Sequence, residues 1–180
     1  ENRDVKTFLN NKTLVISTHL IGQSDIRFLF ATGSRNNNKN SENLKKILKS
    51  IDPKSSISDI SFAGAEIIKY NTFSGRSFFY TFYEDYCMVS SSEILIQKSI
   101  KNINSGASIF TDQNFTKLFK QSRKSADARI YLNYEQFFNA VDKYVNSGFN
   151  DVLTLLKNFA DWTCFDLSLK RKEIKMTGHT

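Results

Sequence analysis

Runs of β-branched and aromatic residues, joined by short turns, constrain this chain more than any other feature of its sequence. Residues 13–21 (TLVISTHLI) and 25–32 (DIRFLFAT) flank the turn Gly22-Gln23-Ser24. Strand-like runs separated by two to five turn residues are typical of β-hairpins. The sequence therefore predicts an antiparallel pair at its start, because the two strands of a hairpin run in opposite directions.

A helix and a second β region follow this hairpin. Residues 41–51 carry apolar residues at helical spacing, and Pro53 ends that helix because proline lacks the N–H that a helix interior needs. We interpret the serine-rich residues 54–64 as a linker. The next three strand-like runs, joined by tight turns, predict a three-stranded meander; they are residues 65–72, 76–83 and 86–90.

Capping residues predict where the later helices begin. Ser90 and Glu93 form an S-x-x-E capping box, which predicts a helix that ends near Gly106. Asp112 is expected to cap the next helix. Further along the chain, Asn133 caps a helix after the strand 128–133, and Asn150 or Asp151 caps a last helix up to about Phe159.

The chain ends in a predicted hairpin made of residues 162–170 and 173–178. Phe165, Leu167 and Leu169 alternate with polar side chains in its first strand. Such alternation is typical of a sheet with one face on the core and one in water. We therefore expect the opposite face, with Cys164 and Asp166, to be the wet one, and Cys164 to be partly exposed.

These blocks favour an α+β fold, in which an antiparallel sheet built from hairpins and a meander carries helices on one face. A length of 180 residues suits a single domain over residues 1–180. The chain begins with Glu1 and lacks a signal-peptide pattern, so we expect a fragment of a longer exported chain. No run of uncharged apolar residues reaches the roughly 18 that a membrane span requires.

The net charge of +7 is spread over both halves of the chain. Nucleic-acid-binding proteins more often concentrate their basic residues on one face or helix, so we expect no nucleic-acid partner. The only two cysteines, Cys87 and Cys164, form no metal-binding motif, and the sequence leaves open whether a disulfide joins them.

Motifs that carry chemistry are missing. The seven glycines never reach the spacing of a dinucleotide or phosphate-binding loop, and the two histidines, His19 and His179, have no carboxylate, cysteine or second histidine at metal-ligand spacing. We interpret His19 as a core or rim histidine. We therefore predict no catalytic residue, no metal site and no cofactor, and hence a protein that is not an enzyme.

Aromatic residues make up 13% of the chain and gather in one strand. The run 76–83 places aromatic side chains on both of its faces. A sheet covered on both sides explains this pattern; a surface that meets a partner or an apolar ligand also explains it. The candidate ligand or interface residues are therefore Phe78, Tyr80, Phe82 and Tyr83.

Four strings carry a family resemblance: YCMVSSSEILIQKSI, SIFTDQNFTKLFKQS, ARIYLNYEQFF and WTCFDLSLKRKEIKMTGHT. Their order of strand, Ser-capped helix, acid-capped helix, Asn-ended strand and closing hairpin resembles a family of exported bacterial envelope proteins that is defined as a domain of unknown function. The match is best over residues 77–180. The resemblance implies an extracytoplasmic domain, in the periplasm or at the cell surface, that is membrane-anchored or a lipoprotein, and it supplies no catalytic residues.

We therefore predict a non-enzymatic extracytoplasmic binding or scaffolding module, whose partner is another protein or another domain of the same chain. Two alternatives remain at this point. The aromatic strand could line a site for an apolar or lipid-like ligand, or the chain could be a hydrolase without the usual motifs. A flat exposed aromatic patch in the structure would favour the binding or scaffolding module. A closed aromatic cavity would favour the site for an apolar or lipid-like ligand.

Overall fold

A computed structural model describes residues 13–22, 25–35, 37–122, 126–141, 155, 160–170 and 173–180. The chain divides into two compact units, Glu1–Gly106 and Ala107–Thr180. The sequence pattern did not indicate this division, and the single domain over residues 1–180 stays a prediction. Among the described residues, no helix is long and apolar enough to cross a bilayer.

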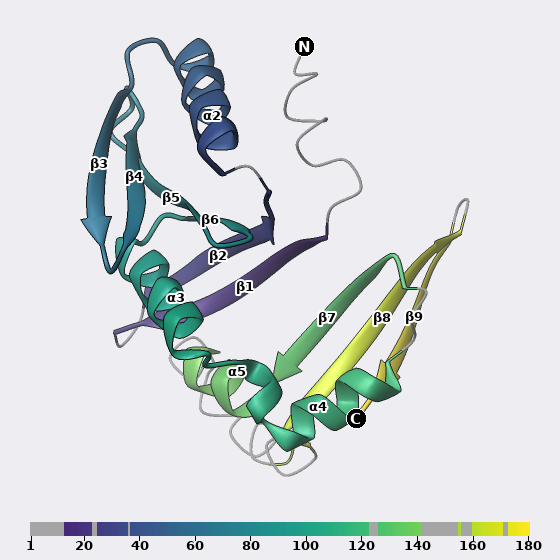
Figure 1. Cartoon of the computed structure of the whole chain (residues 1–180). Coiled ribbons are helices and arrows are strands. Elements are labelled where there is room, and N and C mark those ends of the chain that lie inside the picture. Colours follow the sequence, from purple (N-terminus) through teal and green to yellow (C-terminus); the bar gives the residue numbers. More distant parts are fainter. Residues whose placement is uncertain are drawn as a thin grey trace. The chain divides into compact units, whose positions relative to one another are not determined.

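An antiparallel sheet of six strands forms the first unit (Figure 1). The strands are β1 (Leu14–Ile21), β2 (Asp25–Gly33), β3 (Ser56–Phe62), β4 (Ala65–Asn71), β5 (Ser77–Tyr83) and β6 (Tyr86–Ser90). Their spatial order is β1-β2-β6-β5-β4-β3, so within the described part of the chain β1 and β3 are the two edge strands of the sheet. The predicted hairpin and meander are both confirmed.

Helix α3 (Glu93–Ser105) covers one face of this sheet. Its buried Ile96 and Ile100 pack against Ile67, Phe79 and Met88. These sheet residues lie in the central strands β4, β5 and β6. Because successive side chains of a strand point to opposite faces, the neighbours of Phe79 in β5 belong to the other face.

Helix α2 (Asn37–Ile51) covers part of that other face. Leu44 and Leu48 pack against a cluster formed by Ile68, Tyr70 and Tyr80. The antiparallel α+β class is therefore confirmed, but in this unit the helices lie on both faces of the sheet instead of one. The aromatic strand β5 has apolar side chains on both faces because each face meets its own helix.

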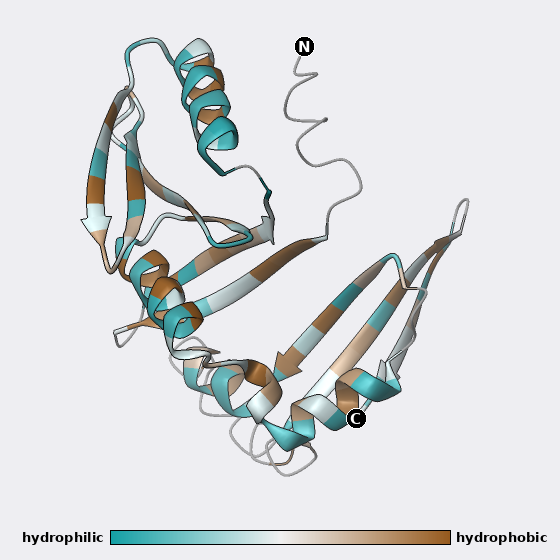
Figure 2. Ribbon diagram, in the orientation of Figure 1, coloured by the Kyte–Doolittle hydropathy of each residue, from teal (hydrophilic) through white to brown (hydrophobic). Residues whose placement is uncertain are grey.

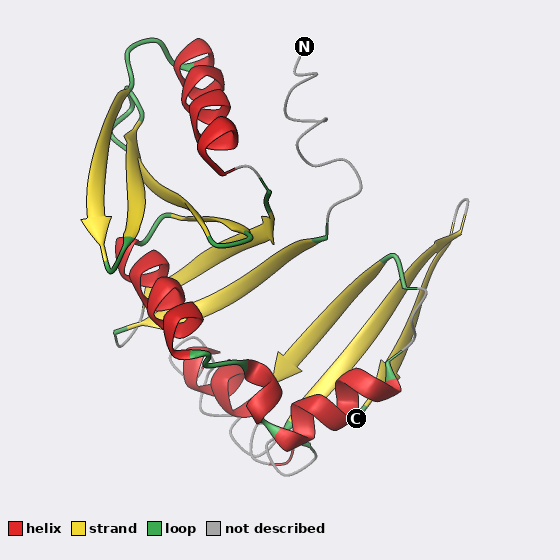
Figure 3. Ribbon diagram, in the orientation of Figure 1, coloured by secondary structure: helices red, strands yellow, loops and turns green. Residues whose placement is uncertain are grey.

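The second unit combines a three-stranded antiparallel sheet with short helices (Figure 3). The strands, in spatial order, are β7 (Ala128–Asn133), β8 (Trp162–Lys170) and β9 (Glu173–His179). The helices whose bounds lie in the described residues are η1 (Ile109–Thr111), α4 (Gln113–Gln121) and α5 (Tyr134–Val141). Phe115 of α4 packs on Tyr131 and Trp162, with ring centroids 5.0 and 5.1 Å away.

The expected wet face of β8 is in fact the buried one. Cys164 is fully buried and Asp166 is 3% exposed, whereas Leu169 is 65% exposed. Tyr131 and Arg129 of β7 stand opposite Cys164 and Asp166 in the register, so this face is the one that α4 covers. The prediction was wrong because buried polar partners compensate Asp166, as described below.

The predicted ends of the helices are partly confirmed. Asp112 accepts hydrogen bonds from the backbone N–H groups of Asn114 and Phe115, which confirms it as the cap of α4. Gly106 ends α3 with a positive φ of 69°, as expected of a glycine at that position. The capping box at Ser90 is wrong: α3 begins at Glu93 after Ser92, and Ser90 belongs to β6.

Two further boundaries differ from the expectation. The predicted linker contains a strand, β3, and α2 begins four residues earlier than the apolar spacing indicated, at Asn37 instead of Ser41. Asn133 is confirmed as a cap, because its Oδ1 accepts from the N–H of Gln136 at 2.8 Å. The helix predicted after Asn150 lies outside the described residues, apart from Leu155.

Candidate functional site

The four aromatic residues singled out in the sequence do not form one surface. Tyr80 is 2% exposed, Phe82 is half-buried in the cluster under α2, and Phe78 is 39% exposed. Tyr83 lies on the opposite face, against the α3 cluster, and its hydroxyl donates to Oδ1 of Asn104 at 2.7 Å. The structure therefore places most of this aromatic surface in the core.

Tyr80 leads to a stability prediction. Its hydroxyl is buried without a hydrogen-bond partner among the described residues, and burial, followed by the negative charge of Asp59, raises its pKa. A buried hydroxyl without a partner costs about 1–3 kcal/mol. We expect Tyr80→Phe to raise the free energy of unfolding by about 1 kcal/mol, measured by urea denaturation.

Tyr70→Phe is the matched control, because Tyr70 lies in the same cluster and its hydroxyl donates to the carbonyl of Leu48 at 3.3 Å. This variant should lose about 1 kcal/mol. If Tyr80→Phe loses as much stability as Tyr70→Phe, the Tyr80 hydroxyl makes a bond in solution, and its assignment as an uncompensated core group is wrong.

A group of exposed apolar side chains of the first unit lies instead on β1 and β2, which Figure 2 shows with brown bands. On one face of these strands the apolar side chains are largely uncovered. They are Leu14 (50% exposed), Ile16 (56%), Ile26 (37%), Phe28 (48%) and Phe30 (39%). We call this set the β1–β2 apolar face.

The pairing register places these five side chains together. Ile16 stands opposite Phe30, and the rings of Phe28 and Phe30 are 6.4 Å apart. Phe30 is also paired with Val89 of β6, which packs against the α2 cluster. The β1–β2 apolar face is therefore on the α2 side of the sheet, where α2 covers the central strands and the described residues leave β1 and β2 open.

The sequence contained a signal for this face. Every second residue from Leu14 to Leu20, and from Ile26 to Thr32, is uncharged, and most are apolar. The hairpin was predicted, but its coverage could not be. Whether a helix lies over a strand depends on where the helix packs, and α2 packs on β4 and β5 through Leu44 and Leu48.

A buried polar cluster in the second unit is the other group of reactive side chains. Nε of Arg129 donates to Oδ1 of Asp166 at 2.7 Å, and Sγ of Cys164 lies 3.8 Å from the same oxygen. Nε2 of His179 is 3.3 Å from Oδ2 of Asp166, within ion-pair range but without hydrogen-bond geometry. No single motif contains these residues, and the β7–β8–β9 register brings them together.

The environment of Cys164 does not suit a nucleophile. Burial, followed by the negative charge of Asp166, raises the pKa of the thiol to about 11. Reactive cysteines instead have a lowered pKa and are partly exposed, because the thiolate is the reacting species. Cys164 is a free thiol, and we interpret the cluster around Asp166 as a structural network.

His19 lies on the α3 side of β1, not on the β1–β2 apolar face. Its Nε2 is 2.8 Å from Oγ of Ser17. Burial, and then the positive charge of Lys98, lowers its pKa, so the neutral imidazole is favoured. Within the described residues, no group of three or more His, Cys, Asp or Glu side chains is arranged to hold a metal ion.

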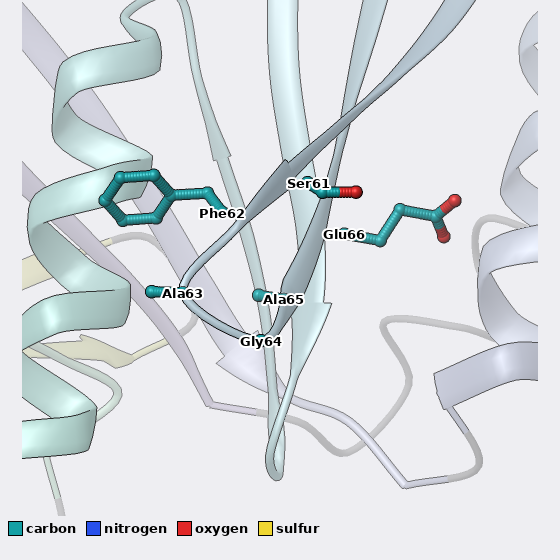
Figure 4. Close-up of a pocket in the computed structure, with 6 residues that line it drawn as sticks. All are labelled: Ser61, Phe62, Ala63, Gly64, Ala65 and Glu66. Atoms are coloured by element: carbon teal, nitrogen blue, oxygen red, sulfur yellow. The ribbon is translucent and has the colours of Figure 1, made fainter.

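A hollow of about 440 Å³ lies at the turn between β3 and β4, lined by residues 61–66 (Figure 4). Ala63 and Gly64 form the turn with positive φ values of 48° and 84°. The side chains of Phe62 and Glu66 point in opposite directions, so few polar groups converge here. Binding sites for small molecules usually present convergent polar groups in a concave apolar pocket, which this open hollow does not resemble.

The chain was also compared with known proteins. No family model, no curated protein and no solved structure matches it. The resemblance to exported envelope proteins therefore stays a prediction, and the β1–β2 apolar face is the candidate site that the geometry itself supports.

Proposed function

We propose that the chain is a non-enzymatic binding module that holds an amphipathic α-helix of a partner protein against the β1–β2 apolar face. The observation that carries this proposal is the exposure of this face. Leu14, Ile16 and Phe28 are each about half exposed, and no charged residue points to this side of β1 or β2. Contiguous exposed apolar side chains of this kind often mark interaction sites.

The dimensions of the face suit a helix. Two neighbouring strands are about 4.8 Å apart, so two of them make a strip about 10 Å wide, which is close to the diameter of a helix with its side chains. The eight residues of β1 extend about 26 Å, the length of a helix of about 17 residues. A partner helix could therefore lie beside α2 on the same side of the sheet.

The position of α2 favours a helix over a flat membrane. Since α2 packs on the same side of the sheet, its body rises about 10 Å above the neighbouring strands. A planar bilayer would meet α2 before it reached Phe28 and Phe30. A single helix, unlike a planar bilayer, can lie on β1 and β2 beside α2.

Charge indicates the chemistry of the partner. Helix α2 carries Lys39 and Lys46, and the whole chain has a net charge of +7. The other two lysines of α2 are engaged near β3, because Lys45 pairs with Asp59 and Lys49 donates to the carbonyl of Ser55. Opposite charges across an interface favour encounter and correct pairing. The partner helix should therefore be acidic on its polar side.

Photocross-linking tests this proposal. With p-benzoylphenylalanine in place of Phe28, we expect a cross-link to a helical segment that is apolar on one side and acidic on the other. That segment, made as a synthetic peptide, should bind the wild-type chain. Phe28→Ser should weaken the binding at least tenfold, because a central aromatic side chain contributes more than about 1.4 kcal/mol at many interfaces.

Phe73→Ser is the matched control for the peptide titration. Phe73 is 70% exposed, lies in the loop between β4 and β5, and is not part of the β1–β2 apolar face. Its variant should bind like the wild type. Equal binding by the Phe28 and Phe73 variants, a cross-link only to phospholipid, or no cross-link at position 28 would each contradict the proposal.

The extracytoplasmic location belongs to the same proposal and is supported only by the sequence resemblance. The protein should be recovered from the periplasm or the cell surface when cells that express the natural gene are fractionated. Recovery in the cytosol would contradict the proposed location. It would not bear on the binding role, which the cross-linking experiment tests separately.

A further inference from the structure

The two edges of the six-stranded sheet are chemically different. Among the described residues, β1 and β3 each have a neighbouring strand on one side only. An edge strand presents unpaired backbone N–H and C=O groups, and proteins commonly protect such edges with charged residues. Edge β3 is protected in this way, because Asp59 stands in the middle of the strand and pairs with Lys45 at 3.5 Å.

Edge β1 lacks this protection. Residues 14–21 contain no acidic or basic side chain other than His19, and no proline. Three of its first residues, Leu14, Val15 and Ile16, are at least half exposed. In a chain with a net charge of +7, this uncharged edge is where a second copy can approach with little repulsion.

The backbone of β1 shows which groups are available at this edge. The carbonyl of Thr13 faces β2, because it accepts a hydrogen bond from Oγ1 of Thr32. Since successive backbone groups of a strand alternate in direction, the N–H and C=O of Ile16, Thr18 and Leu20 point away from β2. Thr18 is exposed and lies near the middle of this free edge.

We propose that β1 pairs in antiparallel fashion with β1 of a second copy, in a register centred on Thr18, so that two six-stranded sheets become one. In this register Ile16 stands opposite the second copy's Leu20, and Val15 opposite its Ile21. Ser17 stands opposite His19, and the two Thr18 residues face each other.

This register is favoured because the strand is self-complementary in it. From Val15 to Ile21 each apolar side chain meets an apolar one and each polar side chain meets a polar one. A register centred one residue earlier, on Ser17, pairs Val15 with His19 and Ile16 with Thr18, which mixes the two types. The interaction is isologous, as a closed twofold dimer requires. It also uses the edge of β1, whereas the binding role proposed above uses the face of β1 and β2.

Sedimentation velocity over a range of protein concentrations tests the dimer. The wild-type chain should shift from monomer to dimer as its concentration rises. Thr18→Lys should raise the dissociation constant at least tenfold, since it places two like charges directly opposite each other. Ser58→Lys, in the other edge strand and also at an exposed position, should leave the dissociation constant unchanged.

A cysteine at the twofold position tests the register. Directly opposed residues of an antiparallel pair have Cα atoms about 4.5–5.5 Å apart, which a disulfide can span. Oxidised Thr18→Cys should therefore form a covalent dimer, whereas Ser58→Cys should not. The proposal is wrong if the wild-type chain stays monomeric at a concentration of about 1 mM, on the order of the weakest specific complexes. It is also wrong if Thr18→Lys dimerises as the wild type does, or if Ser58→Cys alone forms the covalent dimer.

Discussion

Replacing Arg129 with methionine should destabilise the second unit by about 3 kcal/mol, one of the two largest effects we expect of a single substitution in this chain. The side chain of Asp166 is only 2% exposed, and Arg129 donates to it at 2.7 Å. Methionine keeps much of the arginine stem but removes the positive charge. The carboxylate then stays buried with weaker compensation from Cys164 and His179, and removing one partner of a buried ion pair typically costs 3–5 kcal/mol.

Urea denaturation followed by tryptophan fluorescence measures this loss. Trp162 is the only tryptophan of the chain and lies at the start of β8, so its emission reports on the second unit. The double variant Arg129→Met/Asp166→Leu should be more stable than Arg129→Met, because it removes the uncompensated charge as well. If the double variant is the less stable one, Arg129 acts through packing and the ion-pair explanation is wrong.

An exposed pair provides the control. Arg27 and Asp25 also lie 2.7 Å apart, but their side chains are 41% and 51% exposed. Exposed ion pairs contribute about 0–1 kcal/mol, because water screens the charges and already solvates them. Arg27→Met should therefore change stability little, as measured by circular dichroism, despite the same distance between the charged atoms.

The signals that sequence reasoning interpreted correctly depend on neighbours within about one helical turn. Asp112 caps α4 through the N–H groups two and three residues later. Gly106 and Pro53 act through their own backbone geometry. The hairpins around Gly22 and Gly75 were predicted for the same reason, since a turn depends on the few residues that form it.

The features that sequence reasoning missed depend on partners far along the chain. Ser90 looked like a helix cap, but its hydroxyl donates to the carbonyl of Phe28, 62 positions away. Asp166 looked like a residue of the wet face, but Arg129 compensates its charge from 37 positions away. A local sequence pattern shows that a side chain is polar. Only the pairing register of the strands shows whether a hydrogen-bond or ion-pair partner lies opposite it.

The candidate site was missed for a related reason. The apolar alternation of β2 was visible, but its meaning depended on coverage by α2, which packs on β4 and β5 through Leu44 and Leu48. The aromatic run of β5 was predicted to hold the ligand or interface residues because it contains many aromatic side chains. It contains many because α2 and α3 cover its two faces. The dense aromatic run of β5 therefore belongs to the core, whereas the β1–β2 apolar face contains fewer aromatic residues.

Phe115→Ala should remove about 3–5 kcal/mol from the stability of the second unit. Phe115 is 4% exposed, and its ring lies within 6.1 Å, centroid to centroid, of four other aromatic rings. They belong to Phe110, Phe119, Tyr131 and Trp162. Truncation leaves a cavity between α4 and the sheet, and four aromatic rings lose their contact with Phe115 at once.

Phe110→Ala is the matched control, because Phe110 belongs to the same ring cluster but is 50% exposed. Its removal opens the cluster to water without a closed cavity, so we expect a loss of about 1 kcal/mol. Where Phe115→Ala does not fold, Phe115→Leu preserves most of the volume and should lose about half as much as the alanine variant, still more than Phe110→Ala. Equal unfolding midpoints for Phe110→Ala and Phe115→Leu would show that burial under α4 does not set the contribution of Phe115, and the assignment of this cluster as the core of the second unit would be wrong.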